Sequence, residues 1–166
     1  KISGNENTVI FKMKEAYEKE KSLLDALLNY MPDYIYFKDL KSNFIRVSKS
    51  MVSLFNVNDT EDIHGKSDFD FFGNHARKAY EDEQNIIKTG RPLLNDVEEE
   101  DRNDGTTGYV STTKLPLINT ENKIIGTYGI SRDITEQKQT ELELSSKANK
   151  LDECMIEIKR LEELLN

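Results

Sequence analysis

The sequence predicts an α+β domain that carries an amphipathic helix at each end. Two observations predict the domain: two short strands come first along the chain, and three longer strands follow a stretch of short helices. This order favours a five-stranded antiparallel sheet with the helices gathered on one side. A third observation, a heptad stripe on each side of the domain, predicts the two helices. The 166 residues have room for one such domain with these helices.

The first helix is predicted by apolar residues that alternate in steps of four and three. The stripe consists of Val9, Met13, Ala16, Glu20, Leu23, Leu27 and Tyr30. Only Glu20 interrupts it. Because Pro32 disfavours helical geometry at Met31, the helix is expected to end there, which places a domain boundary near residue 32.

Runs of β-forming residues separated by polar turns predict the strands. The expected strands are 34–37, 44–47, 93–100, 109–118 and 123–131. Between the second and third strands the pattern changes to helix: Met51, Leu54 and Phe55 share one helical face, and residues 74–88 form a helix that ends before Gly90.

A second long helix is predicted directly after the last strand. Asp133 can cap it, with Glu136 at the third helical position as in a capping box. Its seam alternates three and four residues through Leu144, Lys147, Leu151, Cys154, Ile158, Leu161 and Leu165. Such a seam requires a partner, so a parallel homodimer through both terminal helices is expected.

Composition excludes several classes of partner. A net charge of -8 and a pI near 4.9 argue against nucleic acid and against an anionic membrane surface. No apolar run reaches the roughly 18 residues that cross a bilayer. The only cysteine is Cys154, which excludes an intramolecular disulfide and makes a cytoplasmic location the simplest expectation. A first residue other than Met and an end inside a helical pattern predict a piece of a longer protein.

Three segments together resemble the PAS domain family over about 100 residues. They are the hairpin opening 33–39, the segment 65–72 and the ending 126–135. The resemblance implies a PAS sensor domain at 33–134, between an N-terminal helix at 1–32 and a coiled-coil signalling helix at 135–166. It also implies that Asp133, Ile134 and Thr135 form the junction that passes a signal from the last strand to this helix.

PAS domains bind haem, flavin, small metabolites or nothing, so the resemblance leaves the cofactor unknown. A flavin photoadduct needs a cysteine in the core, and the predicted core has none. A haem ligand would be expected near Ala79, one helical turn beyond His75. His75 as a haem ligand is therefore the minority interpretation, and a surface histidine is the alternative. A small metabolite or an empty core fits the residues better.

Aromatic and polar side chains of the predicted domain are candidates for lining a pocket. The candidates are Phe37, Met51, Phe55, Phe69, Phe72, Tyr80, Thr112 and Thr127. Core packing explains such aromatic residues more often than a pocket does. Alternation puts Thr112 and Lys114 on one strand face and Thr113 on the other, without indicating which face is inside.

These observations predict a sensory or signal-relay module. The output domain, a histidine kinase, a diguanylate cyclase or a phosphatase, would follow outside this chain. No catalytic constellation is found, so no enzymatic activity is expected, and the acidic residues 96–104 are interpreted as a solvated edge that binds no metal. The alternative is a constitutive dimerisation scaffold with a filled core. Electron density for a ligand in the core, or a coloured cofactor in the purified protein, would distinguish a sensor from a scaffold.

Overall fold

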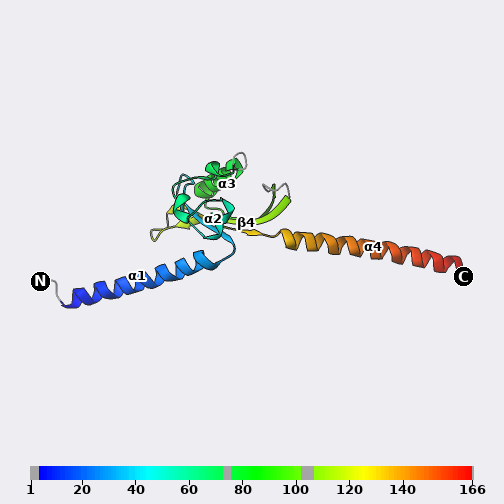
Figure 1. The fold of residues 1–166 in the computed structure, drawn as a ribbon, viewed down its shortest axis with the longest axis horizontal. Helices are drawn as coiled ribbons and strands as arrows, with labels where there is room; N and C mark the ends of the chain where they lie inside the picture. Colours follow the sequence, from blue (N-terminus) through cyan, green and yellow to red (C-terminus); the bar gives the residue numbers. More distant parts are fainter. Residues whose placement is uncertain (1–3, 73–75, 102–106, 166) are drawn as a thin grey trace. The chain divides into compact units, whose positions relative to one another are not determined.

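The computed structural model describes residues 4–72, 76–101 and 107–165. Its elements follow the predicted order (Figure 1). The chain forms α1 (Gly4–Tyr30), β1 (Tyr34–Lys38), β2 (Phe44–Val47), α2 (Ser50–Leu54), η1 (Thr60–Asp62), η2 (Asp68–Asp70), α3 (Ala76–Thr89), β3 (Leu93–Asp101), β4 (Thr107–Ile118), β5 (Ile124–Asp133) and α4 (Thr135–Leu165). The predicted α+β class is confirmed.

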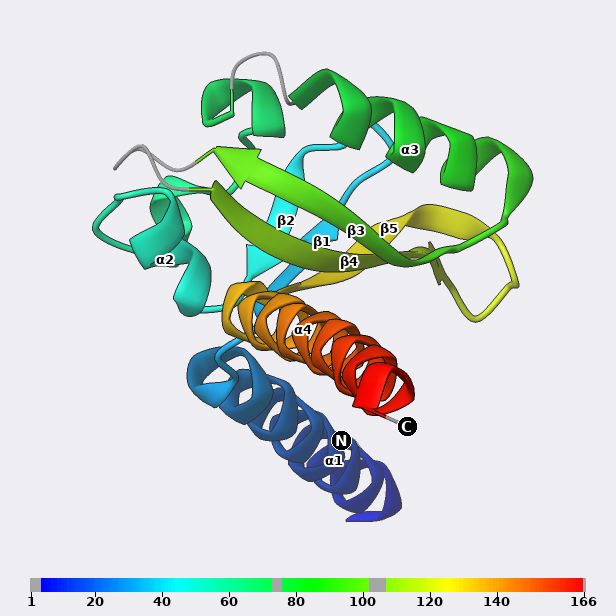
Figure 2. The same ribbon diagram turned by 90° about the vertical axis from the view of Figure 1, so that its right-hand side faces the viewer.

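The five strands form one sheet in the order β2-β1-β5-β4-β3 (Figure 2). β1 pairs antiparallel with both β2 and β5, so it occupies a position inside the sheet although it begins the domain. Tyr36 lies opposite Gly129 of β5, and a Cβ at that glycine would come within 2.4 Å of the Tyr36 ring. The missing side chain of Gly129 therefore lets the Tyr36 ring lie against the neighbouring strand.

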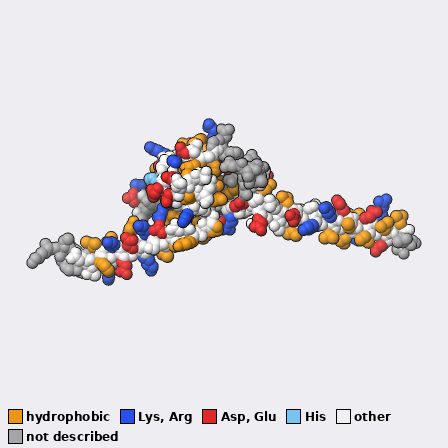
Figure 3. Space-filling model, in the orientation of Figure 1, with side chains coloured by type: hydrophobic (Ala, Val, Ile, Leu, Met, Phe, Trp, Pro, Cys, Tyr) orange, Lys and Arg blue, Asp and Glu red, His pale blue; other side chains and the backbone are white. Residues whose placement is uncertain are grey.

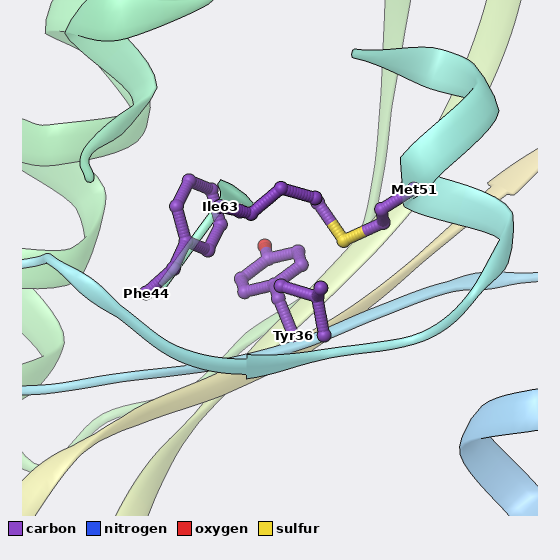
Figure 4. Packing of buried hydrophobic residues seen from close by; sticks show 5 residues of the cluster. Tyr36, Phe44, Met51 and Ile63 are labelled. Carbon is purple, nitrogen blue, oxygen red and sulfur yellow. The ribbon is translucent and has the colours of Figure 1, made fainter. Parts of the chain in front are cut away.

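Apolar side chains between the sheet and α2 form the core of the domain. Tyr36, Phe44, Val47, Met51 and Ile63 are buried together, as Figure 4 shows in part. We call these five residues the apolar cluster. The Phe44 ring meets Tyr36 edge-on at 6.2 Å between centroids, a favoured aromatic arrangement. Because Tyr36 and Phe44 come from adjacent strands, the cluster fixes α2 and Ile63 against one face of the sheet.

Two hairpin turns use the same local chemistry. The side-chain oxygen of Asp39 accepts hydrogen bonds from the backbone N–H groups of Lys41 and Asn43, at 2.8 and 2.9 Å. Asn119 does the same for the residues two and four positions later, at 3.0 and 2.9 Å. Asn and Asp are favoured at turns because their side chains can bond the backbone in this way. These contacts fix where β2 and β5 begin.

Gly65 adopts a backbone conformation that glycine accommodates better than other residues. Its φ of +76° lies in the left-handed region, which residues with a side chain rarely adopt. In this conformation its N–H donates to the carbonyl of Phe44 at 2.8 Å, and the Lys66 carbonyl accepts from the Phe44 N–H at 2.7 Å. The segment before η2 is thereby fastened to β2.

The chain divides into two compact units, residues 1–96 with 112–132, and residues 97–111 with 133–166. The first unit contains α1, whose last turn is anchored by Leu28. This side chain is buried, and its carbonyl accepts a hydrogen bond from the Lys49 N–H at 2.8 Å. An ion pair between Asp25 and Arg46 adds a second contact. No helix in the described ranges has the length and apolar character that a bilayer crossing requires.

Candidate ligand site and signalling junction

Three buried charged side chains meet beside the apolar cluster. The Lys38 ammonium of β1 donates to the Glu83 carboxylate of α3 at 2.6 Å and also to the Asp68 carboxylate of η2. Lys38 is 1% exposed and Glu83 is fully buried. We call Lys38, Asp68 and Glu83 the charged cluster. With all three groups ionised it holds one positive and two negative charges, so it has an excess negative charge inside the domain.

Two buried side-chain oxygen atoms near Lys38 make no hydrogen bond of normal geometry among the described residues, although the Ser42 side chain is close enough to Glu83 to lower the pKa of that carboxyl as a hydrogen-bond donor. One is Oε2 of Glu83, and the other is Oγ1 of Thr127, whose side chain is fully buried. Thr127 lies directly opposite Lys38 across the β1–β5 pairing, so both side chains are on the same face of the sheet. Buried polar atoms without partners are rare in folded proteins and call for a specific explanation.

Burial changes the acid–base properties of this region. It raises the pKa of Glu83 from its ordinary value of 4.5; the Lys38 charge opposes the shift and the Asp68 charge adds to it. Burial also raises the pKa of the Tyr36 hydroxyl well above 10.0, and the nearby carboxylates of Glu83 and Asp68 increase the effect. The interior therefore disfavours additional negative charge.

The inner face of the sheet carries further polar side chains on β4. Lys114 is 5% exposed and donates to Asp82 of α3 at 3.0 Å. Thr112 is also buried and shares a hydrogen bond of 2.9 Å with the hydroxyl of Ser131. Together with Lys38 and Thr127, these residues make the interior below α3 polar, in contrast to the apolar cluster.

The structure distributes the predicted pocket residues among different places. Met51 belongs to the apolar cluster, and Phe55 packs against it while stacking on Phe71 at 4.0 Å. Phe72 contacts Phe55 edge-on, at 5.1 Å between centroids, and is 36% exposed. These aromatic rings pack on one another and on the core.

The remaining predicted pocket residues separate into exposed and buried positions. The rings of Phe69 and Tyr80 lie 5.8 Å apart between their centroids, and both side chains are exposed. Phe37 stacks on Tyr128, and by alternation it points to the opposite face of β1 from Tyr36 and Lys38. Thr112 and Thr127 are the two that lie on the buried face of the sheet beneath α3. His75 lies outside the described residues.

One cavity, of about 250 Å³, lies elsewhere in the first unit. Its lining comes from the end of α1, from β2 and from the segment around η1, and includes Asn29, Ile45 and His64. None of the predicted pocket residues lines it. Among the described residues no group of three or more acidic, histidine or cysteine side chains is arranged to bind a metal ion.

The predicted junction connects α4 to the start of β4. The Asp133 carboxylate accepts a hydrogen bond from the Thr135 N–H at 2.9 Å, and Thr135 is the first residue of α4. The Thr135 hydroxyl accepts from the Tyr109 N–H at 2.9 Å, and the Ile134 N–H donates to the Tyr109 carbonyl at 2.8 Å. The N–H and the carbonyl of Tyr109 are therefore both hydrogen-bonded to residues at the start of the helix.

An ion pair one residue before the junction lies in the first unit. Arg132 of β5 donates to both carboxylate oxygens of Asp33, at 2.9 and 2.6 Å. Asp33 is 7% exposed and directly precedes β1. Its carbonyl also accepts hydrogen bonds from Ser48 and Ser50. This bidentate pair joins the start of the domain to the end of its last strand.

The residues of the predicted dimer seam are exposed on both terminal helices. Apolar side chains are visible along α1 and α4 on the face drawn in Figure 3. The exposed seam residues are Met13, Leu23, Leu27, Leu144, Leu151, Cys154, Ile158 and Leu161. Leu165 belongs to α4, but its side chain lies outside the described residues. Exposed apolar stripes of this kind mark interaction surfaces.

The sequence interpretation missed Lys38, Asp68 and Glu83 as site residues, although a signal for two of them was present. Lys38 continues the alternation of Tyr34 and Tyr36 on β1, so it occupies a position where a core residue is expected. Glu83 follows the buried Ala76 by seven residues and precedes the buried Ile86 by three. Each is a charge at an apolar position of a periodic pattern, and such a charge must have a buried partner.

Comparison with known proteins identifies the family. The model of the PAS fold matches residues 28–139, which is more than half of the chain. The chain belongs to the PAS family. Its five-stranded antiparallel sheet with flanking helices agrees with that family's fold, as the sequence resemblance implied.

The similar proteins include signalling proteins. A methanogenesis regulatory histidine kinase, FilI of Methanothrix harundinacea, is 27% identical over 112 residues, which are 68% of this chain and 12% of that protein. This chain therefore spans about one eighth of the curated relative that it matches. VqmA bound to DPO has a TM-score of 0.59 and 25% identity, over 65% of this chain and 55% of VqmA. The PAS domain of BvgS from Bordetella pertussis, at 19% identity, has a TM-score of 0.59 over 80% of this chain and 98% of that domain.

Proposed function

We propose that this chain is the sensory PAS module of a larger signal-transduction protein, that it is a homodimer, and that it relays a change in its interior to an output domain through α4. The observation that carries the proposal is the connection at the junction. The last strand is followed after one residue by α4, and that residue, Ile134, and the first residue of the helix, Thr135, are both hydrogen-bonded to Tyr109 of β4. A shift of the sheet strands would therefore be passed to the helix.

The relatives support the sensory part of this proposal. One is a histidine kinase, and another is a structure with DPO bound. Because this chain spans only a small part of the kinase, the output domain would lie outside it and would be a histidine kinase, a diguanylate cyclase or a phosphatase. We propose no catalytic activity for the module itself. A reducing, cytoplasmic location suits Cys154, a free and exposed thiol on α4.

The proposed module has three parts, an N-terminal helix at 1–32, a sensor domain at 33–134 and a signalling helix at 135–166. The helix α4 has 31 residues and is therefore about 46 Å long. A small rotation or change of crossing angle at Thr135 would produce a larger displacement at its far end. Asp33 and Arg132 are placed to transmit such a change, because their ion pair joins β1 to the last residues of β5.

Substitutions in the seam test the dimer. We expect the wild-type chain to be a dimer at micromolar concentration and a variant with Leu151→Asp and Ile158→Asp to be a monomer, because buried carboxylates would face one another across the seam. The measurement is light scattering coupled to size-exclusion chromatography. The matched control, Ser146→Asp with Asn149→Asp, adds the same charge off the seam and should stay dimeric. A monomeric wild-type chain would contradict the proposal.

The competing function is a constitutive dimerisation scaffold. To separate it from a relay, the full-length protein is compared with its Asp133→Ala variant, which loses the hydrogen bond to the Thr135 N–H. A relay predicts that this change uncouples the output from the input while the protein stays dimeric. A scaffold predicts that the output activity stays unchanged in the variant.

A further inference from the structure

We propose that the cavity between the end of α1, β2 and the segment around η1 binds a small zwitterion, of the class of α-amino acids with a short apolar side chain. The cavity has a volume of about 250 Å³ and lies at the edge of the sheet, because β2 is the outermost strand on that side. No residue of α3 lines it, so it is separate from the interior beneath that helix. The inference goes beyond the proposed relay and does not require it, because all of the lining belongs to the first unit.

Contacts outside the cavity hold each of its walls in place. The last turn of α1 is fixed by the buried Leu28, whose carbonyl accepts from the Lys49 N–H. The strand β2 is paired with β1. The Asp62 carboxylate accepts from the N–H groups of Asn58 and Asp59, and the Asp59 carboxylate caps the start of η1. Because these contacts do not depend on a ligand, the cavity is preformed, as most ligand sites are.

The floor of the cavity is apolar. Leu28, Phe44 and Val47 line it and are buried. Phe44 and Val47 also belong to the apolar cluster, so a ligand in the cavity would contact the core of the domain from its outer side. An apolar floor with charged groups around it suits a molecule that has a short apolar side chain beside its charged groups.

Charged groups of both signs surround this floor. Asp25 and Arg46 form an ion pair, and their side chains are 39% and 38% exposed. This pair involves one nitrogen of the Arg46 guanidinium, so its other N–H groups can donate to a ligand carboxylate in the planar geometry that arginine favours. Glu61 lines the cavity from η1, and its carboxylate can only accept, which suits a ligand ammonium.

A ligand with a single charge fits these groups less well than a zwitterion does. A cation would be attracted by Glu61 and Asp25 but repelled by Arg46, and an anion would experience the reverse. A molecule with both charges can pair with Arg46 and Glu61 at once, and it brings no net charge into a region where part of its water is lost. His64 and Thr60, which also line the cavity, can supply further hydrogen bonds.

The volume of the cavity limits the size of the ligand. A water molecule in the liquid takes about 30 Å³, so 250 Å³ corresponds to about eight waters. Valine, which has about as many non-hydrogen atoms, would fill a comparable space, whereas a haem or a flavin is several times larger. The size and the mixed charge together point to a small amino acid.

Calorimetric titration with L-alanine, L-valine and L-leucine tests the proposal. Two molecules of matched shape serve as controls: isobutylamine lacks the carboxylate of valine, and 3-methylbutanoate lacks its ammonium. We expect at least one of the amino acids to bind with a Kd below about 1 mM. Each control should bind at least about tenfold more weakly than valine, because it loses one charged hydrogen-bonding group.

Substitutions assign the two charged contacts. Glu61→Gln should weaken valine binding about tenfold and remove most of its advantage over 3-methylbutanoate, because the ammonium loses its charged acceptor. Arg46→Met should remove most of the advantage of valine over isobutylamine. A purely structural role of either side chain would not change these preferences. The matched control is Glu121→Gln, which alters an exposed carboxylate outside the lining and should leave the Kd of valine unchanged.

Amide chemical shifts measured during the titration locate the bound amino acid. The proposal requires the largest changes within residues 28–29, 45–47 and 60–64, a result that stands even if one variant fails to fold. It is overturned if none of the three amino acids binds saturably up to about 10 mM, if either control binds as well as valine, or if the changes lie elsewhere. Valine binding by the monomeric seam variant would support the site independently of the dimer. A wild-type dimer that binds none of the amino acids would overturn only the site.

Discussion

The apolar cluster and the charged cluster share one strand and differ in almost every other respect. Tyr36 and Lys38 are two residues apart on β1 and point to the same face of the sheet. Tyr36 packs with Met51 and Ile63, whereas Lys38 pairs with two buried carboxylates. A shift of two positions along the strand thus changes the interior from apolar contacts to ion pairs.

This difference shows that the two clusters contribute differently to the free energy of folding. Apolar contacts gain free energy for every buried methylene group and tolerate small changes of shape. Ion pairs must first offset the loss of water from three charges, and they fail when one member is removed. The apolar cluster therefore suits a stabilising role, whereas the charged cluster makes the stability of the domain depend on the charges of its three members.

The largest expected effect is that of Lys38→Met, which removes the cation that pairs with both Asp68 and Glu83. The side chain keeps a similar length, so the change tests charge more than packing. We expect a loss of about 3–5 kcal/mol in the free energy of unfolding at neutral pH, because two buried carboxylates lose their counter-ion. Urea unfolding followed by circular dichroism measures it.

The matched control for this substitution is Lys123→Met. Lys123 also pairs with a carboxylate, that of Glu121 at 2.9 Å, but both side chains are about 70% exposed. Exposed pairs contribute only about 0–1 kcal/mol, so this variant should be nearly as stable as the wild type. Similar losses in the two variants would show that burial does not distinguish the charged cluster from a surface pair.

Glu83 should give the charged cluster a dependence on pH in the acidic and neutral range, where the apolar cluster has none because the pKa of its Tyr36 hydroxyl is raised well above 10.0. Because the pKa of Glu83 is raised above its ordinary 4.5 in the folded state, the folded chain binds its proton more tightly than the unfolded chain. The contribution of Glu83 to stability therefore falls as pH rises from 4.5 through the raised pKa, by no more than about 1.4 kcal/mol per pH unit.

The measurement compares the wild type with Glu83→Gln by urea unfolding between pH 4.5 and about pH 8. Subtracting the two curves removes most of the contributions of carboxylates away from the cluster. The groups that face Glu83 are Lys38, Asp68 and Ser42, and their coupling to it stays in the difference. A difference that is flat with pH, or that favours the wild type more as pH rises, would contradict the expected sign.

The sequence predicted the fold well because the fold depends on periodic patterns. The alternation in β1, the turn residues after it and the heptad steps of α1 and α4 are local, and each predicts its element without knowledge of the rest. The charged cluster depends on contacts between residues far apart. Lys38 meets Asp68 and Glu83 across 30 and 45 positions, so only the folded chain brings them together. Lys38 and Glu83, each a charge at a core position of a periodic pattern, were the local indications.

The aromatic residues illustrate the same limit. Phe55, Phe69 and Phe72 were predicted from composition as pocket candidates, and composition does not distinguish a ring that lines a cavity from a ring that packs on other rings. Strand alternation separates Phe37 from Tyr36 but leaves open which face is buried. That choice depends on where α3 packs against the sheet, which is a property of the whole fold.

The smallest expected effect is that of Ile63→Val in the apolar cluster. Ile63 is fully buried, so the loss of one methylene group should cost about 1 kcal/mol in the free energy of unfolding, whereas Ile125→Val at an exposed position should cost almost nothing. Combined with Glu83→Gln, the Ile63→Val loss should add within about 0.5 kcal/mol if the two clusters are energetically independent. A larger deviation would mean that Phe44, which touches Lys38 and belongs to the apolar cluster, couples them, and a change in the interior would then reach α2 as well as β5.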